Sequence, residues 1–130
     1  MYYRKLWLTF GIIYIITIFL LSLVKVPDIS SPISHSDKII HFLMYFILVG
    51  WFVQLYENRQ IRLFVLLCAI FLGLFIELLQ GMTSYRNFDY YDGIANSIGA
   101  IAAFSLAKTS FSCILSKVDI LIAAKLNKIT

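Results

Sequence analysis

Four long apolar stretches are the feature that most constrains how this chain can fold. The first covers residues 6–24, which as a helix spans about 28 Å and so matches the hydrocarbon thickness of a bilayer. Three more follow at residues 39–56, 63–79 and 93–107. With 61% hydrophobic and 14% charged residues, a water-soluble fold would leave large apolar patches exposed. The sequence therefore predicts an all-α polytopic membrane protein, a bundle of four transmembrane helices.

The first apolar stretch and the last residues of the chain each have two interpretations. The apolar core of a cleaved signal peptide has only about 7–15 residues, whereas this one is longer and ends in Lys25-Val26-Pro27, so we expect a retained helix. Residues 1–107 then form the membrane domain. In residues 108–130 apolar residues recur at helical spacing, accompanied by lysines, which predicts a basic amphipathic cytoplasmic tail. This tail either lies in the membrane plane or, in its first turns, ends the fourth span.

Lysine and arginine are distributed unequally between the two predicted membrane faces. Eight lie at the amino terminus, in the loop at residues 57–62 and in the tail, and three lie on the opposite side. By the positive-inside rule, both termini are expected in the cytoplasm. A homo-oligomer is a possible assembly.

Charge and cysteine content exclude two other classes. The net charge of +4 comes from residues that flank apolar stretches, not from a basic patch interleaved with aromatic residues, so we expect no nucleic-acid partner. Cys68 and Cys113 are far apart in the chain. Their spacing fits neither a disulfide framework nor a zinc site.

Most acidic residues and both histidines gather near the outer predicted face. The second and fourth spans begin there and the third ends there, so their polar residues share one depth. On each span these residues recur at i, i+3 or i, i+4 and therefore occupy one helix face. The candidate site residues are Asp37, His41, Tyr45, Glu77, Gln80, Arg86, Asp89, Asp92 and Asn96. Ala95, Gly99 and Ala103 add a stripe of small residues that lets a neighbouring backbone approach closely.

Glu77, His41 and Asp37 are the catalytic candidates. Glu77 lies inside the third apolar stretch, where a carboxylate needs a partner or a proton. His41 lies at a similar depth in the second. A functional acid–base group is one interpretation, and a structural ion pair between Glu77 and His41 is the other.

The remaining candidates are interpreted as ligand-binding residues, and several have a structural alternative. Arg86 would hold a phosphate or carboxylate. Asp37 and Asp92 are equally well explained as N-caps of their helices, and Gln80 and Asn96 as interhelical hydrogen-bonding residues. Lys38 is expected to extend to the membrane interface.

Metal ligation is a further alternative for the acidic side chains and His41. These ligand types suit Mg²⁺, Mn²⁺ or Zn²⁺, but the spacing selects none of them. No metal and no cofactor is therefore assigned from the sequence.

The polar residues also follow a recognisable order. The pattern is Asp37-Lys38-x-x-His41-Phe42-x-x-Tyr45, then Glu77-x-x-Gln80, then Arg86, Asp89, Asp92, Asn96 and Gly99. Over roughly residues 6–107 this resembles the VanZ-like family of small bacterial membrane proteins, named for a member associated with resistance to teicoplanin. The resemblance implies a four-span protein of the bacterial inner membrane with its polar positions at these residues. It implies no particular activity.

Three functions agree with these features. The first is binding of a lipid, or of an amphiphilic lipid-linked or glycopeptide ligand, at the outer-face site, with a link to teicoplanin-type resistance. The second is a membrane-embedded acid–base enzyme acting on a lipid or lipid-linked envelope precursor, although the chain has no HExxH or GxSxG motif. The third is a transport or scaffold subunit of a membrane complex.

Overall fold

The computed structural model describes residues 1–24, 36–83 and 89–127, and within these ranges every regular element is a helix. The predicted all-α class is confirmed. The elements are α1 (Arg4–Leu23), α2 (Ser36–Leu55), α3 (Arg59–Gly81), α4 (Tyr90–Leu106), the short 3₁₀ helix η1 (Ser110–Cys113) and α5 (Ile114–Leu126). Each of the first four overlaps one predicted apolar stretch and begins a few residues before it.

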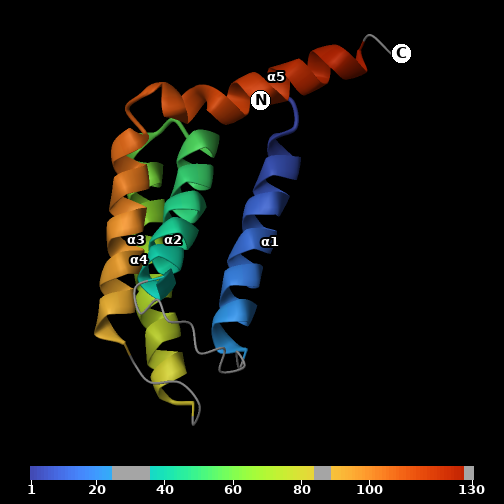
Figure 1. Ribbon diagram of the computed structural model, residues 1–130. Coiled ribbons are helices and arrows are strands. Elements are labelled where there is room, and N and C mark those ends of the chain that lie inside the picture. Colours follow the sequence, from blue (N-terminus) through green and yellow to red (C-terminus); the bar gives the residue numbers. More distant parts are fainter. Residues whose placement is uncertain (25–35, 84–88, 128–130) are drawn as a thin grey trace.

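The four long helices α1 to α4 run side by side, and α5 crosses one end of them (Figure 1). By length and composition, α1, α3 and residues 37–55 of α2 are apolar enough to cross a membrane, while α4 has 17 residues and forms the fourth member of the bundle. Large apolar side chains such as Phe64 and Phe71 of α3 are exposed on the outside. A bilayer would cover them, and the chain is therefore an all-α polytopic membrane bundle.

The most extensive contact between two helices in the described part of the chain joins α2 and α4, and small residues lie in it. A Cβ atom added to Gly99 would lie 2.1 Å from the backbone oxygen of Phe42, so the two backbones touch at this point. Ala100 and Ala103 are fully buried beside it, whereas Ala95 is half-buried. The close approach expected from the stripe of small residues is confirmed, and it fixes how α2 and α4 lie against each other.

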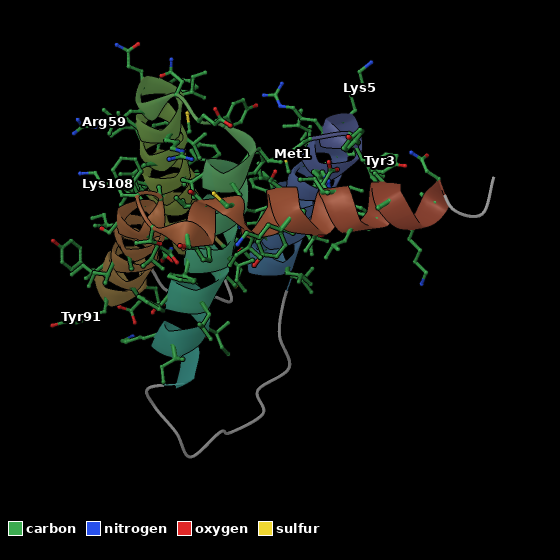
Figure 2. All side chains as sticks on the ribbon, turned by 90° about the horizontal axis from the view of Figure 1, so that it is seen from above. Met1, Tyr3, Lys5, Arg59, Tyr91 and Lys108 are labelled. Carbon is green, nitrogen blue, oxygen red and sulfur yellow. The ribbon has the colours of Figure 1, made fainter. Side chains whose placement is uncertain are left out.

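Helix α5 is tied to the first residues of the chain. The segment from η1 through α5 is bent by 81° from α4, so the tail does not continue the fourth span. The carboxylate of Asp119 is fully buried. It accepts hydrogen bonds from the backbone N–H groups of Tyr2 and Tyr3 and from the Trp7 indole, the last two at 2.9 Å and 2.7 Å. Figure 2 shows α5 crossing the bundle with Met1 and Tyr3 beside it.

Asp119 was not among the sequence candidates. The acid lies in a lysine-containing tail and its partners are more than a hundred residues away in the chain, so no local pattern indicates its role. With α5 across the end of the bundle that also holds the start of α1, the geometry favours the membrane-plane alternative for the tail.

Candidate functional site

At the opposite end of the bundle, polar side chains from α2, α3 and α4 meet and form what we call the polar cluster. Its members are Asp37, Lys38, His41, Tyr45, Glu77, Asp89, Asp92 and Asn96. All predicted site residues except Gln80 and Arg86 belong to it, and Lys38 is an addition. Most of the members are buried inside the bundle.

The start of α4 is organised by Asp89. This residue is the N-cap, and its side chain accepts a 2.8 Å hydrogen bond from the Tyr91 backbone N–H. Asp92 lies in the first turn of α4 and is buried, so the interpretation of Asp92 as the N-cap is wrong. Asp37 likewise lies inside the first turn of α2, which begins at Ser36. Both carboxylates are thereby free to take part in side-chain contacts.

Lys38 joins α2 to α4. Its ammonium lies 2.9 Å from Asp89 Oδ2 and 3.1 Å from Asp92 Oδ1. The Lys38 side chain is 35% exposed, so its pairing with the two carboxylates is compatible with the predicted position at the membrane interface. The hydrogen bond from Lys38, followed by the backbone bond from Tyr91, lowers the pKa of Asp89. The sequence signal that could have indicated this role is its i, i+3 spacing from His41, which places both on one helix face.

His41 is buried and its two ring nitrogens have different surroundings. Nδ1 lies 3.1 Å from Asn96 Oδ1. An amide oxygen only accepts hydrogen bonds, so Nδ1 carries the proton in this arrangement. Nε2 lies 3.5 Å from Asp92 Oδ2 and 4.0 Å from Asp37 Oδ1. The lone pair of a neutral His41 would thus face two carboxylates.

Glu77 and Tyr45 bring incompletely paired polar atoms into the core. The Glu77 carboxylate is 1% exposed and accepts a backbone hydrogen bond from Asp89. Its Oε1, like the buried Tyr45 hydroxyl, has no hydrogen-bond partner within the described part of the chain. Such an atom costs about 1–3 kcal/mol. A buried site that retains two of them is a candidate for binding something else.

An open pocket of about 220 Å³ lies between α3 and α4 beside Glu77. Glu77 and Asp89 supply polar lining, and the rest of the wall is mostly apolar or aromatic. The lining residues are Leu74, Glu77, Asp89, Tyr90, Gly93, Ile94, Ser97 and Ile98. A Cβ atom on Gly93 would lie 3.6 Å from Leu74 Cδ2 and 3.9 Å from Glu77 Cγ. The pocket therefore has a polar end and an apolar wall.

Two predicted residues are not placed in the cluster. Gln80 is buried, and its amide donates a 2.8 Å hydrogen bond to the backbone oxygen of Ser22. This joins α3 to α1, in agreement with the interhelical alternative for Gln80. Arg86 lies outside the described residues.

Known proteins resemble this chain in the region that contains the polar cluster. The family model VanZ/LLP1 matches residues 5–113, a range that includes the whole polar cluster. The chain belongs to the VanZ/LLP1 family. The resemblance found in the sequence is thereby confirmed.

A relative from outside bacteria also matches. An uncharacterized protein of the fission yeast Schizosaccharomyces pombe is 36% identical over 78 residues, which cover 58% of this chain and 48% of that protein. The chain thus spans about half the length of this curated relative. Because the relative is eukaryotic, the expected bacterial origin is not confirmed. No solved structure matches the chain.

Proposed function

We propose that this VanZ/LLP1-family protein binds the head group of a membrane amphiphile in the pocket between α3 and α4. The observation that supports this most directly is that Glu77 lines the pocket and that its buried Oε1 is unpartnered within the described residues. A ligand that donates a hydrogen bond or brings a positive charge would satisfy this atom.

The shape and charge of the pocket favour a particular kind of amphiphile. The polar cluster contains more carboxylates than cations among the described residues, with Lys38 as its ammonium. A head group with amine or hydroxyl donors therefore fits better than a purely anionic one. Along α4, Ile94 and Ile98 line the pocket and are exposed on the outside of the bundle. They provide a surface for an acyl chain that extends into the bilayer.

The distribution of lysine and arginine supports a pocket at the outer face with both termini in the cytoplasm. The ligand is a membrane lipid, a lipid-linked envelope precursor or an amphiphilic glycopeptide. The fission yeast relative favours a lipid found in both bacterial and eukaryotic membranes. A link to teicoplanin-type resistance would then arise where the drug competes with that lipid for the pocket.

A pair of serines on α4 allows a matched test. Ser97 lines the pocket and Ser105 does not, yet each donates a 2.9 Å hydrogen bond to the carbonyl four residues earlier. Native mass spectrometry of the purified protein should show co-purified lipid in the wild type and in Ser105→Leu. Ser97→Leu fills the pocket and should lose that lipid. Equal lipid retention by the two variants would contradict the proposal.

An acid–base enzyme is the second candidate, and the contact between His41 and Asp92 favours it. Asp92 Oδ2 lies 3.5 Å from His41 Nε2 and would stabilise the imidazolium formed when His41 removes a proton from a hydroxyl group or water. Incubation with phospholipids and lipid-linked precursors, followed by mass spectrometry, should then yield a product that His41→Ala fails to make. Binding without any product in the wild type would leave the first candidate alone.

A further inference from the structure

We propose that Asp37, His41 and Asp92 bind a divalent transition-metal ion of the Zn²⁺ type where α2 and α4 begin. Each of these residues offers one ligand atom, and the three atoms lie within 4.8 Å of one another. The set contains one imidazole nitrogen and two carboxylate oxygens. This site stands on contacts other than those of the amphiphile pocket and does not depend on that proposal.

The ring orientation of His41 indicates a cation at this position. Because Nδ1–H donates to Asn96 Oδ1, the lone pair of Nε2 points into a space that also contains Asp92 Oδ2 and Asp37 Oδ1, at 3.5 Å and 4.0 Å. Three electron-pair donors facing each other repel unless a positive species lies between them. Either a proton on Nε2 or a metal ion would meet this requirement.

The distances agree with a metal ion. In a tetrahedral zinc site with bonds of about 2.1 Å, neighbouring ligand atoms lie roughly 3.4 Å apart. The separation of 3.5 Å between His41 Nε2 and Asp92 Oδ2 is already close to this value. Asp37 is 65% exposed in its side chain, so it can complete the set by a small rotation.

The surroundings hold the ligands as a metal site requires. Asn96 accepts the hydrogen bond from the second ring nitrogen of His41, which is the usual way in which a ligating histidine is oriented. Lys38 contacts Oδ1 of Asp92 and leaves Oδ2 available. The backbone contact between Gly99 and Phe42 fixes the helix that carries Asp92 against the one that carries His41.

The charge around Glu77, which also lines the amphiphile pocket, adds to this support. Its buried carboxylate interacts electrostatically with His41 and Asp92, and its Oε1 has no partner within the described residues. Buried carboxylates need compensating positive charge, and a divalent cation beside His41 and Asp92 would supply it. Since one ligand is an imidazole, Zn²⁺ fits better than Mg²⁺ or Ca²⁺, which prefer oxygen ligands.

Metal titration of the full-length, untagged protein in detergent tests this proposal without any lipid readout. After treatment with a chelator, calorimetry should show one Zn²⁺ bound per chain, and Co²⁺ should give the visible absorption of a low-symmetry nitrogen–oxygen site. His41→Ala and Asp92→Asn should abolish binding, and Asn96→Ala should weaken it by about 10–100-fold. Excess Mg²⁺ should not displace the Zn²⁺.

Two control variants and one exposed ligand keep the result interpretable. Glu57→Gln changes an exposed acid at the opposite end of the bundle, and Ser105→Leu changes an exposed position of α4 outside the polar cluster; both should bind Zn²⁺ as the wild type does. Asp37→Asn alters an exposed residue and leaves the core intact, so its weaker binding tests the site even where a buried variant fails to fold. Absence of Zn²⁺ binding in the wild type would overturn the proposal. Undiminished binding in Asp37→Asn and in a folded His41→Ala would overturn it as well.

Discussion

The bundle buries a carboxylate near each of its ends, and the two carboxylates have opposite hydrogen-bonding states. Asp119, at the end crossed by α5, is fully buried and both of its oxygens accept hydrogen bonds. Glu77, in the polar cluster, is 1% exposed, and its Oε1 has no partner within the described residues. The first arrangement is that of a structural contact, and the second agrees with the ligand site proposed above.

Because their hydrogen bonding differs, the two carboxylates also contribute differently to the stability of the fold. A satisfied buried carboxylate stabilises the fold because its removal leaves several donors without an acceptor. An unsatisfied one costs stability, and proteins retain such costs mainly where function requires them. Replacing the Asp119 carboxylate should therefore lower the free energy of unfolding, whereas replacing the Glu77 carboxylate should keep it or raise it.

The largest effect is expected from Gly99→Ala, because the polar cluster depends on the contact between α2 and α4. The added Cβ would lie 2.1 Å from the Phe42 backbone oxygen, and backbone atoms cannot move aside as a side chain can. We expect a loss of about 3 kcal/mol in the free energy of unfolding, the upper end of the usual range for overpacking, measured as a lower Tm and a lower folded yield in detergent.

Gly93→Ala is the matched control on the same helix. Its Cβ would make contacts of 3.6 Å and 3.9 Å with side chains of Leu74 and Glu77, which are ordinary van der Waals distances, so its Tm should stay close to that of the wild type. If Gly99→Ala were as stable as Gly93→Ala, the backbone contact would not be what holds the two helices together.

The next effect is expected from Asp119→Asn. The amide keeps one acceptor and places a donor against a backbone N–H of Tyr2 or Tyr3. The Tm should fall by several degrees, and trypsin should cleave α5 faster at its exposed lysines, such as Lys117. Glu57→Gln, an exposed acid at the same end, should change neither. An unchanged cleavage rate in Asp119→Asn would show that this residue does not hold α5.

A smaller effect of opposite sign is expected from Glu77→Gln. Glutamine can still accept the Asp89 backbone hydrogen bond while removing the buried negative charge. The free energy of unfolding should stay the same or rise by up to about 1 kcal/mol, and co-purified lipid should be lost. A fall in Tm as large as that of Asp119→Asn would show that Glu77 is a structural residue. The two buried carboxylates would then not differ in their effect on stability.

The two ends also differ in what the sequence revealed. The polar cluster was predictable because its members recur at helical spacing inside apolar stretches, where each ionisable residue is conspicuous. Helix direction then placed Asp37, His41, Glu77 and Asp92 at one depth. The fold class was predictable for the same reason, since apolar stretches of this length have few alternatives to membrane helices.

Contacts that depend on distant parts of the chain were not predictable. Asp119 finds its partners at the first residues of the chain, and Lys38 finds Asp89 and Asp92 only once α2 and α4 are packed. The Asp119 contacts leave no local signature, and the i, i+3 spacing of Lys38 from His41 indicates a shared helix face but not the partners of Lys38 on α4. The capping role of Asp89 in place of Asp92 depends on where α4 begins, and helix boundaries are the least predictable feature of a sequence.

The smallest expected effect is a difference in how stability depends on pH at the two ends, through Asp89 at one end and Asp119 at the other. The pKa of Asp89 lies below its ordinary value of 3.8 because Lys38 donates a hydrogen bond to it. Burial alone would raise the pKa of Asp119, but the bonds from Trp7 and the backbone outweigh burial, and this pKa is lowered too. Each group therefore adds stability above pH 3.8 that is lost as the pH falls through its lower folded value.

Asp89 is 41% exposed in its side chain, and solvent screens its ion pair. Asp89 should therefore contribute less of the pH-dependent stability than Asp119 does. Melting between pH 7 and about pH 3 should show a drop for the wild type. Asp89→Asn should retain nearly the whole drop, and Asp119→Asn should lose most of it. The reverse order would mean that the exposed ion pair, and not the buried carboxylate of Asp119, is what acid disrupts first.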